Sequence, residues 1–277
     1  MNHGSQLIAA SIAYLTSAVL YASLVLGAHP ERTRLRLSIA RFAGLAGIFL
    51  HTASIGTRCL VTHHTPVSTP PDLMSAIGWS VAIAYLILDT LRRERSLAAL
   101  GALAFSVSFL CVFCSSVLRL ALPSPGPSVA ELDSSVVSLH VIAVMLAFAF
   151  LILAVASASI YLFEHSLLKR KKIVGGLFSR LPPLATLDAL SLTMISHAFP
   201  LLTIGCIAGT IRAVASHLPL ADSHTLLSVA TWAILGIYLM MRMYSIGTSV
   251  RANYLLIAAL LAAMLTYLAP NQIHHFS

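Results

Sequence analysis

Long apolar stretches alternate along the chain with short polar connections. A helix that crosses about 30 Å of hydrocarbon needs roughly 20 mostly apolar residues. Eight stretches of this chain meet that requirement, which predicts eight transmembrane helices in a single membrane domain over residues 1–277. The predicted spans are residues 6–27, 38–60, 73–91, 97–118, 139–163, 190–211, 226–243 and 252–270.

The composition supports this interpretation. Apolar residues make up 58% of the chain, charged residues only 9%, and the mean hydropathy is +0.90. A soluble domain has about 25% charged and about 45–50% apolar residues. The sequence therefore predicts an all-α fold, a polytopic membrane helix bundle, and excludes a large soluble domain.

The basic residues indicate the orientation of these helices. The net charge is +8, and most of the seventeen Lys and Arg residues lie at the odd-numbered connections. Because cytoplasmic loops collect Lys and Arg, we expect these connections inside and both termini outside. The charge thus reflects membrane topology, and we expect no nucleic-acid partner. These basic residues are Arg32, Arg34, Arg36, Arg41, Arg92, Arg93, Arg95, Lys169, Arg170, Lys171, Lys172, Arg180, Arg242 and Arg251.

The histidines show the opposite distribution. Most of the twelve fall on the expected outer face, where they are either polar fillers in loops that exclude Lys and Arg or ligands for a metal or haem. Neutral imidazole is a common ligand for metals and for haem iron. His140 opens the fifth predicted span, and His274 and His275 follow the eighth, so these three are the main outer candidates.

His51 differs from these because it lies near the middle of the second predicted span. An ionisable group inside a span usually faces the bundle interior and has a function. Arg58 follows seven residues later, on the same helix face and two turns away. This spacing suits an axial haem ligand and a haem propionate partner. In the alternative reading, His51 bonds a neighbouring helix and Arg58 extends to the lipid headgroups.

Two further features favour structural roles. His197 precedes Pro200 in the sixth predicted span, where it can bond a carbonyl that the proline leaves without a donor. Cys111 and Cys114 form a C-x-x-C inside an apolar span, where packing is the favoured role. No C-x-x-C-H haem attachment motif is present.

A G-x-x-x-G motif at Gly205 and Gly209 predicts close approach of two helices. The sequence contains no phosphate-binding loop, no H-E-x-x-H and no G-x-S-x-G motif. We therefore expect no enzymatic activity of the chain on its own.

Several stretches, taken in order, resemble the cytochrome c assembly protein family of CcsA, CcmC and HemX. The resemblance runs from about residue 42 to the end. The first part is residues 51–58 and 64–68, followed by Asp72 in the place of an acidic residue of the family. The second is residues 139–141 together with the long span that they open. The remaining parts are residues 181–184, 199–205, 237–239 with Arg242, and 273–277.

The resemblance implies a b-type haem that is held without covalent attachment. By this resemblance His51 is a transmembrane haem ligand with Arg58 near a propionate, and His140 and His274 flank an outer haem site. Two departures matter. The family's tryptophan-rich segment has no counterpart in residues 212–222, and Met240 stands where a membrane histidine is expected. Methionine can ligate haem iron opposite histidine, so Met240 is either a ligand or a sign that the inner site is lost.

The absence of the tryptophan-rich segment favours the HemX-like branch. The resemblance implies a haem-handling protein of cytochrome c or haem biogenesis in a bacterial inner membrane. Its partners would be haem, membrane lipid and other membrane proteins of cytochrome assembly or of a respiratory complex. The alternatives are a non-catalytic scaffold subunit with the same fold and no haem and, less favoured, a small-molecule transporter.

Overall fold

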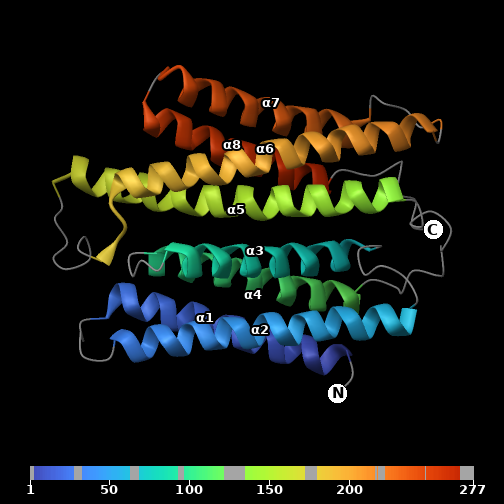
Figure 1. The fold of residues 1–277 in the computed structure, drawn as a ribbon, viewed down its shortest axis with the longest axis horizontal. Helices are drawn as coiled ribbons and strands as arrows, with labels where there is room; N and C mark the ends of the chain where they lie inside the picture. Colours follow the sequence, from blue (N-terminus) through green and yellow to red (C-terminus); the bar gives the residue numbers. More distant parts are fainter. Residues whose placement is uncertain are drawn as a thin grey trace. The chain divides into compact units, whose positions relative to one another are not determined.

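The fold was analysed in a computed structural model of the chain. The structure describes residues 3–27, 33–62, 69–92, 97–121, 135–171, 180–215, 217, 222–246 and 248–268. All regular structure in these residues is helical, and eight helices are long and apolar enough to cross a membrane (Figure 1). They are α1 (His3–Leu26), α2 (Thr33–Thr62), α3 (Pro70–Arg92), α4 (Ala98–Ala121), α5 (Ser135–Lys169), α6 (Leu184–Ala215), α7 (Ser223–Met243) and α8 (Ser249–Leu268).

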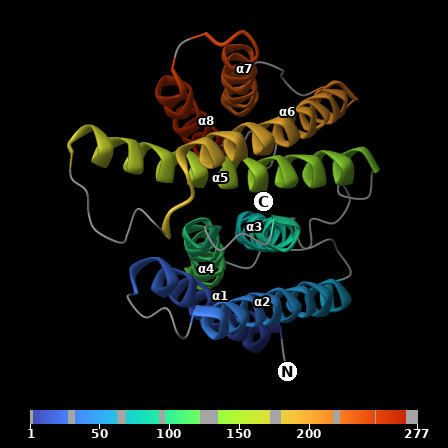
Figure 2. The same ribbon diagram turned by 60° about the vertical axis from the view of Figure 1, so that its left-hand side comes forward.

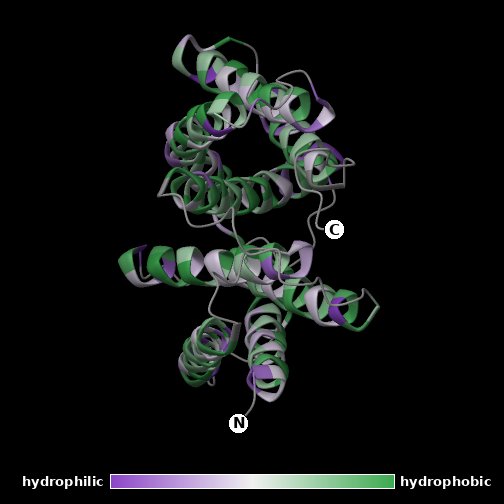
Figure 3. Ribbon diagram, turned by 90° about the vertical axis from the view of Figure 1, so that its right-hand side faces the viewer, coloured by the Kyte–Doolittle hydropathy of each residue, from purple (hydrophilic) through white to green (hydrophobic). Residues whose placement is uncertain are grey.

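The eight predicted spans correspond one to one to these helices, so the predicted fold class is confirmed. Several helices extend beyond their predicted span, most clearly α5 and α6. Hydropathy marks the part of a helix that suits hydrocarbon, while the helix itself continues through polar flanking residues. Hydrophobic residues colour long parts of the helices in Figure 3. The orientation of the termini stays a prediction.

The chain forms two compact units. Unit 1 comprises residues 1–124 and 163–186, and therefore contains α1–α4. Unit 2 comprises residues 125–162 and 187–277, and contains most of α5 and α6 with α7 and α8. The organisation as one membrane domain stays a prediction.

An aromatic column fills the core of unit 1. The rings of Tyr14 and Tyr21, from α1, contact Phe105 of α4 with centroid separations of 5.9 and 5.8 Å. Tyr85 of α3 meets both Tyr21 and Phe105 edge-on at 5.5 Å. All four residues are fully buried. These contacts join α1, α3 and α4 into one core.

Glycines make room for these rings. A Cβ atom at Gly44 would lie 2.5 Å from the Phe105 ring, and one at Gly47 would lie 2.7 Å from the Tyr14 ring. A Cβ at Gly101 would overlap the Tyr85 hydroxyl. Small residues let membrane helices approach closely, and here the space is used by aromatic side chains.

Helices α5 and α6 lie side by side in unit 2 (Figures 1 and 2). The Ser191 hydroxyl of α6 donates to the Ala154 carbonyl of α5 at 3.3 Å. Helix α7 packs on α6 through Trp232, which stacks on Phe199 with a centroid separation of 5.4 Å. The Trp232 indole also donates to Thr203 Oγ1 at 2.9 Å. The helices of unit 2 are thus held by polar contacts as well as apolar packing.

Candidate functional site

His51 is fully buried in unit 1 and bonded through both ring nitrogens. Its Nε2 lies 2.8 Å from Ser75 Oγ of α3, and its Nδ1 lies 3.3 Å from the Tyr14 hydroxyl of α1. The imidazole therefore links three helices. A ring nitrogen of His51 reaches an iron atom only if one of these hydrogen bonds opens. The role of His51 as a haem ligand stays a prediction.

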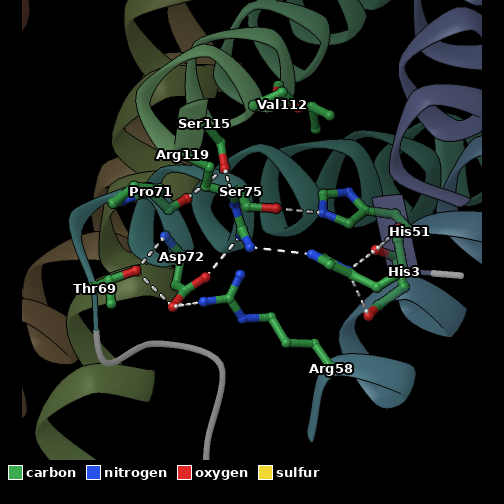
Figure 4. Close-up of polar contacts among 12 residues, drawn as sticks. His3, His51, Arg58, Thr69, Pro71, Asp72, Ser75, Val112, Ser115 and Arg119 are labelled. Atoms are coloured by element: carbon green, nitrogen blue, oxygen red, sulfur yellow. Dashed lines mark hydrogen bonds and ion pairs between the residues drawn. The ribbon is translucent and has the colours of Figure 1, made fainter. Parts of the chain in front are cut away.

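Arg58 faces α3, as does His51, which agrees with the seven-residue spacing. Its guanidinium donates to Asp72 Oδ2 at 3.0 Å. Arg119 of α4 donates to the other oxygen, Oδ1, at 2.7 Å, and Thr69 donates to Oδ2 at 2.6 Å (Figure 4). The Asp72 carboxylate is 2% exposed, so two arginines neutralise a buried charge. The role of Arg58 as a propionate partner stays a prediction.

The local sequence explains the position of Asp72. Thr69 precedes α3, and its carbonyl accepts from the Leu73 N–H at 3.0 Å. Pro70 and Pro71 occupy the first turn, where a missing N–H costs no helical hydrogen bond. Asp72 is the acidic residue of this first turn, and its N–H points to Thr69 Oγ1 at 3.4 Å. A helix start thus places the carboxylate between α2 and α4.

His3 completes this polar network at the start of α1. Its Nδ1 lies 2.7 Å from Ser54 Oγ and 3.2 Å from the Ser54 carbonyl oxygen. Arg119 donates to His3 Nε2 at 3.1 Å (Figure 4). Because arginine only donates hydrogen bonds, Nε2 accepts and the proton of His3 lies on Nδ1. Sequence patterns alone do not identify these partners of His3.

His140 has a different environment in unit 2. Its Nδ1 lies 2.7 Å from the backbone carbonyl oxygen of Gly205 on α6. A carbonyl only accepts, so Nδ1 carries the proton and the lone pair lies on Nε2. Within the part of the chain that the structure describes, Nε2 has no hydrogen-bond partner. Histidines that bind metals commonly donate their other ring N–H to a carbonyl in this way, which orients the ring.

The G-x-x-x-G motif provides the space for the His140 ring. A Cβ atom at Gly209 would lie 2.9 Å from His140 Cε1 and 3.0 Å from Nδ1. A Cβ at Gly205 would lie 2.6 Å from Val144 Cγ2, one turn further along α5. The predicted close approach of two helices is confirmed. The motif also positions a candidate ligand, a role that the sequence analysis did not assign to it.

Two polar residues neighbour His140 at this end of unit 2. Arg212, one turn beyond Gly209 on α6, is close enough to interact with His140 electrostatically. His224, in the first turn of α7, is likewise close enough to interact with both His140 and Asp222. No sequence motif pairs these residues with His140. Their only shared signal was that each lies beside an expected outer connection.

The remaining predicted ligands are Met240, His274 and His275, and none of them is found beside His51 or His140 in the described residues. Met240 is on α7 in unit 2 and is 57% exposed, so it faces away from the interior of its own unit. Its proposed pairing with His51 of unit 1 stays a prediction. His274 and His275 lie outside the described residues. In the described ranges, no group of three or more His, Cys, Asp or Glu residues could hold a metal ion.

The two features with expected structural roles do pack against neighbours. His197 Nδ1 lies 2.6 Å from the Thr193 carbonyl oxygen, and its ring stacks on Phe150 with a centroid separation of 5.4 Å. The bonded carbonyl is one turn before His197 and is not the Ser196 carbonyl that Pro200 leaves without a donor. Cys111 lies where α3 and α4 pack together. A Cβ atom added at Gly78 would lie 2.8 Å from the Cβ of Cys111.

Comparison with known proteins identifies the family. The family described as "Cytochrome C assembly protein" matches residues 67–275, which is most of the chain. The chain therefore belongs to the cytochrome c assembly protein family. It is 25% identical to "Cytochrome c biogenesis protein CcsA" of Guillardia theta over 94% of this chain and 91% of that protein.

Two further relatives carry the same name. The chain is 24% identical to CcsA of Pyropia yezoensis over 79% of this chain and 80% of that protein. It is 28% identical to CcsA of Prochlorococcus marinus strain MIT 9303 over 63% of this chain and 62% of that protein. The predicted family is confirmed, while the placement nearer the HemX-like branch stays a prediction.

Proposed function

We propose that this protein acts in cytochrome c biogenesis by binding b-type haem without covalent attachment, with His140 as an iron ligand. The observation that carries the proposal is the single hydrogen bond of His140. Its Nδ1–H donates to the Gly205 carbonyl, and its Nε2 lone pair has no partner among the described residues. Family membership supports haem as the ligand, because the named relatives are cytochrome c biogenesis proteins.

The residues around His140 suit such a ligand. An axial imidazole supplies electron density to the iron, and its hydrogen-bonded N–H sets its orientation. Gly209 leaves room for the ring to approach α6 closely. Arg212 and His224 add a cation and a second imidazole within electrostatic range of His140. The side chains of this chain thus hold and orient the haem, whose iron supplies the reactive chemistry.

The proposal extends to the location of this site. The basic residues at the odd-numbered connections support a location of the beginning of α5 at the outer face of a bacterial inner membrane. The proposed partners are haem, lipid and other membrane proteins of cytochrome assembly. His274 or His275 as a second ligand is a further part of this proposal, whereas the inner pair of His51 and Met240 stays a prediction of the sequence.

The scaffold alternative has one observation in its favour. Both ring nitrogens of His51 are bonded, and Arg58 is paired with Asp72. These two residues serve the packing of unit 1 as they stand. A protein that kept this packing and lost haem would look the same in unit 1, so the support for haem binding comes from the environment of His140.

An absorption spectrum of detergent-purified protein from haem-replete cells tests the proposal. We expect a Soret band in the wild-type protein that is lost in His140→Ala. His197→Ala is a matched control, because His197 also bonds a carbonyl of α6 but lies exposed beside its own helix. A colourless wild-type protein with no uptake of added haem would support the scaffold instead.

A further inference from the structure

A second polar cluster lies in unit 2, where α6 begins and the chain turns from α7 to α8. Asp188 of α6 accepts from Arg242 of α7 at 2.6 Å. Ser249 of α8 bonds both, accepting from Arg242 at 3.1 Å and donating to Asp188 Oδ2 at 3.3 Å. Three helices therefore meet at one ion pair.

This cluster leaves several polar atoms without a partner, in contrast to the Asp72 network of unit 1. Asp188 Oδ1 and Arg242 Nε are buried and have no hydrogen-bond partner among the described residues. The same holds for the Tyr238 hydroxyl and for both the oxygen and the nitrogen of the Asn253 amide. Tyr238 and Asn253 are each 0% exposed.

The helix register brings these atoms together. Helices α7 and α8 run antiparallel, and the Arg242–Ser249 contact fixes their alignment. Tyr238 lies on α7 one turn further into the span than Arg242. Asn253 lies on α8 one turn further into the span than Ser249. Tyr238 is close enough to interact electrostatically with both Arg242 and Asp188. The unpartnered atoms therefore form one group that extends inward from the ion pair.

The chemistry of the group selects its ligand. The group offers donors on Arg242, Asn253 and Tyr238, and acceptors on Asp188 and Asn253. Its one negative and one positive charge are already paired, so neither an anion nor a metal cation gains a net attraction. A small neutral molecule that both donates and accepts satisfies all of these atoms. Water meets this description, and buried water typically bonds to such otherwise unsatisfied groups.

We propose that water occupies this end of unit 2 and extends from the Asp188–Arg242 pair to Tyr238 and Asn253, forming a hydration site inside the membrane-spanning segment. The side chains of the ion pair are each 19% exposed, which connects the site to the surface of the unit. An unpartnered amide in hydrocarbon is costly, and water removes that cost. The site is independent of haem and stands or falls apart from the proposed function.

Cysteine accessibility in inverted membrane vesicles, which expose the expected cytoplasmic side to the reagent, tests this proposal. The native thiols Cys59, Cys111, Cys114 and Cys206 are first replaced by alanine. Asn253→Cys is then compared with Leu256→Cys, one turn further along α8 and also 0% exposed. The probe is a charged, water-soluble methanethiosulfonate reagent, which reacts only with thiols that water reaches.

We expect Asn253→Cys to react at least tenfold faster than Leu256→Cys. A second pair on α7 repeats the test independently if Asn253→Cys fails to fold. This pair is Tyr238→Cys and Leu235→Cys. The native Tyr238 is 0% exposed and the native Leu235 is 1% exposed. Failure of both polar positions to react, or equal reaction at polar and apolar positions, would overturn the hydration site. Reaction confined to the polar positions supports it whether or not the protein binds haem.

Discussion

Buried His51 and half-buried His140 have opposite hydrogen-bonding states. His51 in unit 1 is held at both ring nitrogens by side-chain hydroxyls from two other helices. Among the described residues, His140 in unit 2 is held at Nδ1 alone, by a backbone carbonyl. A ring that is bonded on both sides cross-links helices, while a ring fixed on one side presents a lone pair in a set direction. The comparison teaches that the bonding state of a histidine, more than its depth in a membrane span, separates a candidate ligand from a helix cross-link.

The two environments also differ in charge. Near His51, Asp72 is surrounded by Arg58, Arg119 and Thr69, and every oxygen of the carboxylate is bonded. Around His140, Arg212 and His224 lie within electrostatic range, and the imidazole ring packs against Gly209. Substitutions in unit 1 should therefore act on stability, and substitutions near His140 should act on haem binding.

The largest effect is expected for Asp72→Asn. This change removes the charge that neutralises Arg58 and Arg119 while conserving the shape of the side chain. Breaking a buried ion pair from one side costs about 3–5 kcal/mol of unfolding free energy. Denaturant unfolding in detergent measures the loss. Thr69→Ala removes only an uncharged partner of the same carboxylate, so an equal loss in both variants would contradict the electrostatic account.

A smaller effect, on haem affinity, is expected for Gly209→Ala. The new Cβ would lie 2.9 Å from His140 Cε1, so the ring must shift from its present orientation. Changes that disturb the orientation of a metal ligand weaken binding by about 10–100-fold. Haem titration followed at the Soret band measures this change. Gly236→Ala is the matched control, because its Cβ meets only Phe199 at an ordinary 3.5 Å. If both variants bind haem alike, the G-x-x-x-G motif does not position the ligand.

For His51→Ala we expect a loss of stability with the Soret band retained. The change leaves the Ser75 and Tyr14 hydroxyls unpaired, which costs about 1–3 kcal/mol. Thermal unfolding and an absorption spectrum of the same sample report both outcomes. Loss of the band in a protein that remains folded would restore His51 as a transmembrane haem ligand and break the comparison.

The smallest effect concerns Asp222, which caps α7. Partial burial by itself raises the pKa of this carboxyl, but hydrogen bonds from Thr225 and the nearby His224 hold the pKa below its ordinary value. The cap therefore stabilises the fold above the unfolded pKa of about 3.9, and this contribution is lost as pH falls through the lower folded value. Asp222→Ala should cost about 1 kcal/mol at pH 7 and progressively less below pH ~4, as measured by denaturant unfolding. A cost that is independent of pH would contradict this role.

The sequence predicted much of the fold for a simple physical reason. Hydrocarbon imposes a minimum apolar length, so each span is visible in its own residues without knowledge of its neighbours. The extension of α5 from residue 135 to 169 was not predicted, because helical hydrogen bonds continue where hydropathy falls. Sequence periodicity also predicted that His51 and Arg58 share a face.

The partners of those side chains could not be predicted in the same way. Periodicity gives the direction of a side chain around its own helix but does not identify the helix it meets. The pairing of Arg58 and Arg119 with Asp72 joins three helices that are separate in sequence. Similarly, the glycines of α6 indicated a close approach, while only the fold shows that the His140 ring fills the space.

The most direct test of the account is imidazole rescue of His140→Gly. Removing the ring leaves its space beside Gly209 open, so free imidazole can replace the missing ligand. The account predicts that the variant lacks the wild-type Soret band and that added imidazole restores it, while His51→Gly shows no such dependence. An unchanged Soret band in His140→Gly without imidazole, with the protein folded, would contradict the assignment of His140 as the haem ligand.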